Sequence, residues 1–296
     1  MNKSVSKNGE KPINKEGETM YQRDIETIMS YKKQFDYDYW TTEDLRLFKG
    51  SPYNAVTAPT YLVELGIPID DPVIQANVDL LFSVLREDGR FKVYPKGGMV
   101  PCQTTITLTS LCRLGQAQDP RLENSYRYFL ETQEADGGWK CKKYSFGRGP
   151  ETEFSTPMTT LYVLHAFIYQ PNFKELRQLD GAVEFLLKHW EMKVPIGPCH
   201  YGIGRLFMQV EYPLGDYNIF HYVYVLSHYP KAQKDPRFLE AFEWLKSRTV
   251  ADQIVVERHS PRLNKLAFCK KGEVSQLATK YYQMILENLI INKGAD

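Results

Sequence analysis

The sequence predicts an all-α protein built from repeated helical hairpins. Two apolar segments end in a leucine followed by glycine, at Leu65 and Leu114, as helices do when glycine takes the C-terminal stop position. At three places an Asp-Pro pair opens a new apolar stripe, with the acid as N-cap and proline as the first helical residue. These pairs are Asp71-Pro72, Asp119-Pro120 and Asp235-Pro236. No strand pattern of comparable strength occurs, so the rhythm indicates roughly five hairpins with a period of about 50 residues.

The composition is that of one large domain outside the membrane. The chain has 296 residues, of which 43% are apolar, enough for a substantial core. The net charge of +1 gives no general footprint for nucleic acid. No run approaches the roughly 18 apolar residues of a membrane span, and the N-terminus lacks the apolar core of a signal peptide. The five cysteines have no paired short spacing, which favours a reducing compartment and hence the cytoplasm.

The chain divides into a short tail and one domain. Residues 1–20 are rich in Lys, Asn, Glu, Gly and Ser, with almost nothing to bury, so we expect a disordered polar tail. Residues 21–296 form the single folded domain. Its first helix is expected over residues 21–35, where Ile25, Ile28 and Met29 have roughly helical spacing.

Helical segments with apolar stripes then follow one another to the end of the chain. Our expected ranges are 53–65, 73–85, 102–114, 122–130, 156–167, 179–190, 217–229, 238–245 and 274–291. A tight glycine loop follows the stripe in two of them. Asp88-Gly89-Arg90-Phe91 is a less complete version of Asp136-Gly137-Gly138-Trp139, which supports an internal repeat.

The segment before the second of these loops carries a recognisable motif. Tyr128 and Phe129 are followed by Gln133 and then by Gly137-Gly138-Trp139. This pattern resembles the QW motif of the terpenoid cyclase and protein prenyltransferase superfamily, which includes squalene cyclase-like proteins. The resemblance implies an α/α toroid of about five to six helical hairpins around a central apolar cavity. So few hairpins would leave an open or small ring, or one closed by the helix over 21–35, by an oligomer or by a partner chain.

The resemblance implies a prenyltransferase or terpene cyclase-like protein that binds an isoprenoid or other hydrophobic molecule in the cavity. Two family motifs are absent. The acid motif Asp-x-Asp-Asp of class II cyclases has no match, and we assign Asp70 and Asp71 to helix capping. Neither does the sequence contain the Asp-x-Cys of the prenyltransferase zinc site. Catalytic residues are therefore not identified, and the alternative is a non-catalytic toroid that serves as a binding or scaffold module with structural zinc.

Three cysteines lie in loops, or at a helix start, that a toroid places on one rim. They are Cys102, Cys141 and Cys199, and His200 adjoins the last of them. Three thiols and an imidazole are a ligand set that zinc favours, and four protein ligands would close the site. We therefore predict a zinc site of these four residues. The alternatives are ordinary packing, because free cysteine is usually buried as a small apolar group, or a redox-active thiol.

Two loops carry the residues expected to contact a substrate. The loop over 140–149 has four cations, which could bind a diphosphate or another anionic head group. The stretch over 201–224 is rich in aromatic rings, whose faces can stabilise a cationic carbon. A solvated charged loop and aromatic core packing are the respective alternatives. The expected substrate-binding residues are Trp139, Lys142, Lys143, Arg148, Tyr201, Tyr217 and Tyr222.

Overall fold

The protein is mostly helical with one small two-stranded sheet. The computed structural model describes residues 21–141 and 143–291, so the predicted disordered tail over 1–20 lies outside the described residues. The α-helices are α1 (Gln22–Ser30), α2 (Ala58–Glu64), α3 (Pro72–Ser83), α4 (Pro101–Leu111), α5 (Glu123–Glu131), α6 (Pro157–Phe167), α7 (Leu179–Met192), α8 (Ile219–Ser227), α9 (Pro230–Gln233), α10 (Pro236–Lys246) and α11 (Gln276–Ile291). No helix in the described part of the chain is long and apolar enough to cross a membrane.

Capping residues set the helix boundaries as the sequence predicts. Asp71 accepts a hydrogen bond from the backbone N–H of Val73 at 2.8 Å. Asp119 and Asp235 each accept one at 2.9 Å from the backbone N–H two residues further on. The predicted C-terminal stops are also confirmed, because Gly66 and Gly115 have φ angles of +104° and +87°. Gly115 lies within the wider helical turn Cys112–Gln116 that extends α4, and its backbone there is no longer helical.

The sheet was not predicted. It consists of β1 (Thr249–Val250) and β2 (Gln253–Ile254), paired antiparallel. The two residues between the strands, Ala251 and Asp252, have φ angles of +48° and +57°. Two successive positive φ angles are the conformation of a tight type I′ hairpin turn, which usually selects Asn or Gly. Alanine at the first of these positions gives no such signal in the sequence.

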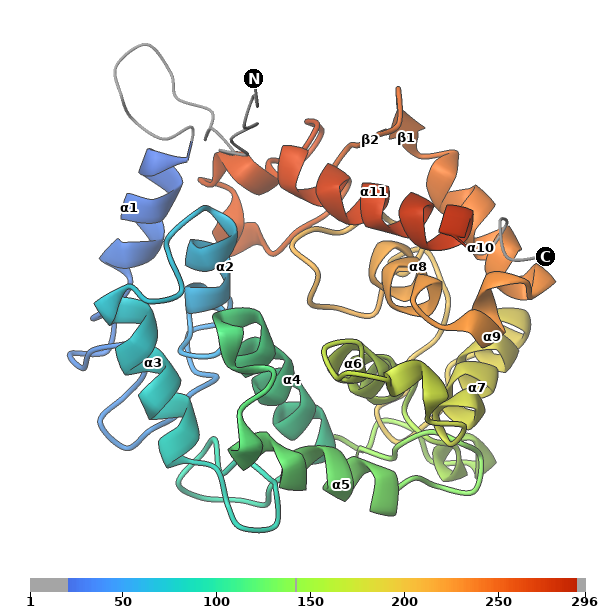
Figure 1. Ribbon diagram of the computed structural model, residues 1–296, viewed down its shortest axis with the longest axis horizontal. Coiled ribbons are helices and arrows are strands. Elements are labelled where there is room, and N and C mark those ends of the chain that lie inside the picture. The colour runs from blue at the N-terminus through green and yellow to red at the C-terminus, as the bar shows by residue number, and fades with distance from the viewer. Residues whose placement is uncertain (1–20, 142, 292–296) are drawn as a thin grey trace, which may run out of the picture.

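The helices alternate between an inner and an outer position. Figure 1 shows α2, α4, α6 and α8 nearer the middle of the molecule, with α3, α5, α7 and α10 outside them. Neighbouring inner helices pack directly, α4 on α6 and α6 on α8, and α8 packs on α11. The inner helices α4, α6 and α8 are buried along most of their length, and the sequences of α6 and α8 are accordingly apolar on almost every face, whereas α4 buries several threonines.

The two ends of the described chain are tied together. The Asp24 carboxylate on α1 accepts hydrogen bonds from the backbone N–H groups of Ala267 and Phe268, at 2.9 and 2.8 Å. Tyr53 donates to the carbonyl of Arg262 at 3.1 Å. In Figure 1 the first helix, in blue, accordingly lies beside the red C-terminal segment. Contacts across more than 200 residues of sequence thus join the first hairpin to the last.

The Gln133 to Trp139 segment forms a clasp between neighbouring hairpins. Gln133 donates through Nε2 to the carbonyls of Gly137, at 2.6 Å, and of Gln178 before α7, at 3.2 Å. The buried Trp139 donates through Nε1 to the carbonyl of Phe129 at 2.8 Å. Gly137 has φ +90°, and a Cβ there would lie 2.4 Å from the carbonyl oxygen of Gly181. The motif therefore joins α5 to α7 through contacts that admit no larger residue at this turn.

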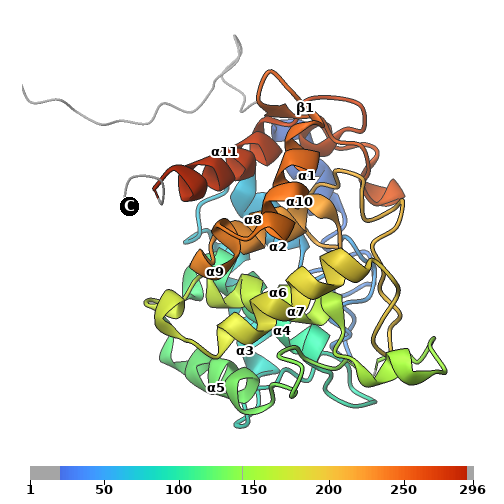
Figure 2. The same ribbon diagram turned by 90° about the vertical axis from the view of Figure 1, so that its right-hand side faces the viewer.

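Long connections gather at one side of the molecule. The connection between α5 and α6 lies against the one between α7 and α8, on the right of Figure 2. Two backbone hydrogen bonds link them: Phe146 donates to the carbonyl of Pro198, and Gly197 to that of Glu151, both at 2.9 Å. This arrangement brings the segments around Cys141 and Cys199 together.

Candidate functional site

Three of the five cysteines converge, as the sequence predicts. The sulfurs of Cys102, in the first turn of α4, and Cys141 lie 3.0 Å apart. The Cys199 thiol donates to the carbonyl oxygen of Cys141 at 3.2 Å and contacts that of Tyr144 at 3.7 Å. Cys141 is 1% exposed, whereas Cys102 and Cys199 are half-buried. We call Cys102, Cys141 and Cys199 the thiol cluster.

The Cys102 and Cys141 thiols titrate as a coupled pair. Contact with the Cys102 side chain, and then with that of Cys199, lowers the pKa of Cys141. The contact with Cys141, followed by burial, raises the pKa values of Cys102 and Cys199. The two contacting sulfurs therefore share the proton between them, and removal of a proton belongs to the pair.

The geometry of the thiol cluster differs from that of a bound metal. Zinc–sulfur bonds of about 2.3 Å in a tetrahedron place two sulfurs about 3.8 Å apart, well beyond the 3.0 Å between Cys102 and Cys141. His200, the predicted fourth ligand, is exposed, and its ring helps to lower the pKa of Glu151, after the larger effect of the Gly149 backbone N–H. Within residues 21–141 and 143–291, no group of three or more His, Cys, Asp or Glu side chains could hold a metal ion. Zinc at these residues stays a prediction.

The predicted basic residues lie at the surface. Lys143 and Arg148 are exposed, and Lys143 lies over the ring of Tyr144 with its Nζ 5.1 Å from the ring centroid. Lys142 lies outside the described residues. Lys140 pairs with Glu153 at 3.4 Å, so part of the loop's positive charge is compensated. Neither Lys143 nor Arg148 lines the central cavity described below.

The predicted aromatic residues come together as a packed group. The Tyr201 and Tyr217 rings meet edge to face at 5.9 Å between centroids, and Tyr222 stacks on Trp190 at the same distance. The buried hydroxyls are bonded: Tyr217 to His189 at 2.7 Å, and Tyr222 to the carbonyl of Leu186 at 3.1 Å. Neither Trp139 nor these three tyrosines lines the central cavity. Their ring contacts and satisfied hydroxyls are typical of core packing.

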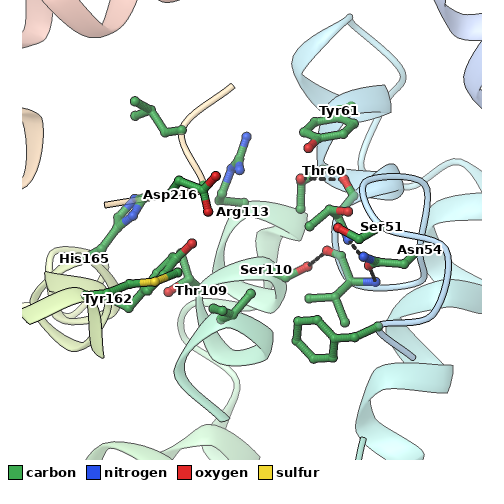
Figure 3. A pocket seen from close by; sticks show the side chains of 17 residues that line it. Ser51, Asn54, Thr60, Tyr61, Thr109, Ser110, Arg113, Tyr162, His165 and Asp216 are labelled. Atoms are coloured by element: carbon green, nitrogen blue, oxygen red, sulfur yellow. Dashed lines mark hydrogen bonds between the residues drawn. The ribbon is translucent and has the colours of Figure 1, made fainter. Parts of the chain in front are cut away.

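A cavity of about 210 Å³ opens between α2, α4, α6 and the loop before α8. Its apolar surface comes from Phe48, Val56, Ile106, Met158 and Leu214. Figure 3 shows its polar lining as two walls with residues between them: His165, Tyr162 and Asp216 on one side, Ser51, Asn54, Thr60 and Tyr61 on the other, and Arg113 and Ser110 between. An apolar surface with a few convergent polar groups is typical of a small-molecule site. We call it the central cavity.

Three polar atoms of the central cavity have no hydrogen-bond partner in the described part of the chain. They are Asn54 Nδ2, Thr109 Oγ1 and His165 Nε2. The three residues are 1%, 6% and 4% exposed. A buried polar group without a partner costs roughly 1–3 kcal/mol, so three around one space require an explanation. Because the atoms themselves are buried, a molecule in the central cavity would become their partner once the side chains around them rotate.

The contact with His221 determines whether His165 presents a hydrogen-bond donor or an acceptor to the central cavity. His221 Nδ1 lies 3.1 Å from the carbonyl oxygen of Asp216, which can only accept, so this nitrogen carries the proton. Burial lowers the pKa of His221 to about 4, so its other nitrogen, Nε2, is an acceptor at neutral pH. His165 Nδ1, 2.9 Å away, must therefore donate to it. Burial, followed by the charge of His221, also lowers the pKa of His165, which leaves a free lone pair on Nε2.

Arg113, the positively charged residue of the central cavity, already forms an ion pair within the protein. Arg113 Nη2 lies 2.9 Å from Glu64 Oε2, and both side chains are mostly buried. The Tyr212 hydroxyl donates to the other oxygen of Glu64. The positive charge is thus compensated within the protein, which makes Arg113 a poor anchor for a strongly anionic group such as a diphosphate.

An acidic residue with a raised pKa adjoins the central cavity. A second cavity, of about 120 Å³, shares Asp216 with the first and is also lined by Glu211. Burial and then the charge of Asp216 raise the pKa of Glu211 to about 8, against the opposing effect of Arg258 at 3.1 Å. Near neutral pH this carboxyl holds a proton, as a general acid must.

The sequence reasoning missed Asn54, Thr109, His165 and Glu211. A weak signal exists for two of them. His165 interrupts the apolar run of α6, and Glu211 lies in an otherwise apolar loop segment next to Val210. A single polar residue in an apolar run is more often a hydrogen-bonded core residue than part of a site, so the signal becomes specific only once the cavity is known.

No protein-family model matches the chain. No curated protein matches it either.

Proposed function

We propose that this chain is an α/α toroid of the prenyltransferase and terpene cyclase type whose central cavity binds a small, mainly apolar molecule with a hydroxyl head group. The alternation of inner and outer helices supports the toroid, as does the contact of Asp24 on α1 with residues 267–268. The observation that carries the ligand is the set of three buried, unpartnered polar atoms of Asn54, Thr109 and His165 around one cavity.

The size of the cavity limits the ligand. Sites for drug-sized molecules usually measure about 300–1,000 Å³, and the central cavity measures about 210 Å³. A single branched isoprenoid unit or a molecule of similar size is therefore favoured over a long polyene. This restriction narrows the substrate class that the resemblance implies.

The polar groups define the head group. His165 Nε2 is an acceptor, so the ligand should donate a proton to it, and Asn54 Nδ2 is a donor, so the ligand should accept there. A hydroxyl can do either, and since the two residues lie on opposite walls we place the hydroxyl head group at His165. A diphosphate is disfavoured because it offers no proton to His165 and because Glu64 already neutralises Arg113.

The proposed reaction is acid–base chemistry on this molecule. Glu211, protonated near neutral pH, is the proton donor, and the neutral His165 is the acceptor. The two groups line adjoining cavities that share Asp216. The alternative function is a non-catalytic toroid that binds a ligand or partner without reaction, and it differs in leaving a bound alcohol unchanged.

Prenol, a branched five-carbon allylic alcohol, tests the proposal. Saturation-transfer NMR and calorimetry with the full chain should detect prenol binding, with its methyl ether at least tenfold weaker because the ether has no proton to donate. His165→Leu should abolish prenol binding. His228→Leu is the matched control, because His228 also has a buried, unpartnered Nε2 but does not line the central cavity.

Two results would overturn the proposed function. One is equal binding of the alcohol and the ether, which would show that His165 does not select the ligand. The other is equal binding by the His165→Leu and His228→Leu variants, which would place the ligand outside the central cavity. Prenol bound but recovered unchanged after long incubation at neutral pH would support the non-catalytic alternative.

A further inference from the structure

The thiol cluster contains two sulfurs in direct contact and a third close by. Cys102 and Cys141 lie 39 residues apart in the sequence, yet their sulfurs are 3.0 Å apart. This distance is shorter than two zinc-bound sulfurs allow and longer than the roughly 2.05 Å of a disulfide bond. Cys102 and Cys141 are both free thiols in this structure. Their sulfurs therefore need to approach by only about 1 Å to bond.

We propose that Cys102 and Cys141 form a redox-active dithiol site that a small hydroperoxide converts to a disulfide. This site lies in the thiol cluster and is independent of the function proposed for the central cavity. The contact between the two sulfurs carries the inference. The disulfide would join two segments that are distant in the sequence, namely the first turn of α4 and the segment that follows the clasp at Trp139.

The third sulfur of the cluster is engaged elsewhere. The Cys199 thiol donates to the backbone carbonyl oxygen of Cys141 at 3.2 Å, whereas the sulfurs of Cys102 and Cys141 contact each other directly. A thiolate is the nucleophile in thiol oxidation, and Cys102 is the more exposed sulfur of the contacting pair. Cys102 is half-buried rather than fully enclosed, which gives a molecule as small as hydrogen peroxide an approach to the two sulfurs.

The chemistry balances with the hydroperoxide as the only oxidant. The half-buried Cys102 thiol ionises and its sulfur attacks the peroxide, the O–O bond breaks, and a sulfenic acid forms while the departing oxygen takes up the thiol proton and leaves as water or an alcohol. The Cys141 sulfur then attacks the sulfenic sulfur of Cys102, and the Cys141 thiol proton leaves with the sulfenic oxygen as water. Two thiols and one peroxide thus give one disulfide. An external dithiol restores the reduced pair by exchange.

The disulfide would act on a helix that also lines the central cavity. Cys102 lies in the first turn of α4, and Ile106, Thr109 and Ser110 of the same helix line the cavity. Burial, followed by the charges of Asp216 and of the thiol cluster, also raises the pKa of Tyr201. Oxidation of the pair would therefore act on a helix that forms part of the cavity wall.

Peptide mapping after oxidation tests the proposal on the full chain. The reduced protein is treated with hydrogen peroxide, free thiols are blocked with iodoacetamide, and the digest is analysed by mass spectrometry without reduction. We expect a peptide pair joined through Cys102 and Cys141, lighter by two hydrogen atoms than the separate peptides and lost on treatment with dithiothreitol. A linkage from Cys141 to Cys199 instead, or no linkage, would overturn the proposal.

Three single variants sharpen the result. Cys102→Ser and Cys141→Ser should lose the linkage, whereas Cys199→Ser is the matched control and should keep it. Loss of the linkage in Cys199→Ser would contradict a two-sulfur site. The mapping of the wild-type protein decides the question even if a variant fails to fold.

Elemental analysis separates the dithiol from the zinc site that the sequence predicts. The probe is zinc itself, measured in protein purified without an affinity tag and in reduced protein dialysed against zinc sulfate. We expect far less than one zinc per chain and rapid reaction of the half-buried thiols with maleimide. About one zinc per chain, with thiols protected from maleimide until a chelator is added, would overturn the dithiol proposal in favour of a metal centre.

Discussion

The clasp over residues 133–139 and the central cavity differ in whether their buried polar groups are hydrogen-bonded. In the clasp, Gln133, Asp136 and the Trp139 indole are hydrogen-bonded to backbone or side-chain partners. In the cavity wall, atoms of Asn54 and Thr109 have no partner among the described residues. A native fold normally satisfies its buried polar groups and departs from that rule at functional sites. The most recognisable motif therefore belongs to the scaffold, and the candidate site is formed by inconspicuous stretches of the sequence.

The largest expected effect is damage to the clasp. Gly137→Ala should lower the free energy of unfolding by about 3–5 kcal/mol, because the new Cβ combines a positive φ with a steric clash. Gly137 has φ +90°, and its Cβ would lie 2.4 Å from the Gly181 carbonyl oxygen. Gly66→Ala is the matched control, since Gly66 has φ +104° but open space around it, and should cost about 1 kcal/mol. Urea unfolding measures both, and equal losses would show that the clasp does not depend on close packing.

The second effect concerns the charge in the cavity wall. Arg113→Met should cost about 3 kcal/mol in urea unfolding, because it leaves the buried Glu64 carboxylate without its cation. The Arg113 and Glu64 side chains are 18% and 11% exposed, so water screens the pair poorly. The double variant with Glu64→Gln should recover more than half of the loss. If the double variant is no more stable than Arg113→Met, the cost lies in packing rather than in an unpaired charge.

Local signals in the sequence predicted the helices and the clasp, because these depend on neighbouring residues. Asp71, Asp119 and Asp235 cap helices within two residues of their own position, and Gly66 stops one at its C-terminus. Such interactions are determined by a short window of sequence. The β1–β2 hairpin was not predicted because its turn has Ala251 at positive φ, where glycine or asparagine is usual.

The site was only partly predictable because it depends on contacts between distant segments. The convergence of Cys102, Cys141 and Cys199 could be expected from equivalent loop positions, but the direction of His200 could not. His165 becomes informative only through His221, 56 residues away, whose own tautomer is fixed by the carbonyl of Asp216. No short sequence window contains that relation.

The third prediction concerns the pH dependence of stability that protonation of Glu211, beside the central cavity, should cause. The pKa of Glu211 is raised in the folded protein from 4.5 to about 8. Its protonated form therefore contributes stability that is fully present below pH 4.5 and is lost as the pH rises through about 8. Relative to Glu211→Gln, the wild type should lose on the order of 2 kcal/mol of unfolding free energy between about pH 5.5 and 7.5. Parallel curves in urea unfolding across this range would mean that Glu211 is ionised throughout.

The smallest effect compares two buried threonines of α4, one with a bonded hydroxyl and one, in the cavity wall, without a partner among the described residues. Thr107 Oγ1 donates to the carbonyl of Gln103 at 2.9 Å, whereas Thr109 Oγ1 has no partner in the described part of the chain. Both residues are buried, at 0% and 6% exposure. Thr107→Val should cost about 0.5–1 kcal/mol, while Thr109→Val should be neutral or stabilising by up to about 1 kcal/mol, since valine removes an unsatisfied group without changing shape. Thr109→Val should at the same time weaken prenol binding. Equal destabilisation by both substitutions in urea unfolding would mean that the Thr109 hydroxyl is satisfied like that of Thr107, and that the cavity wall is built by the same rule as the clasp.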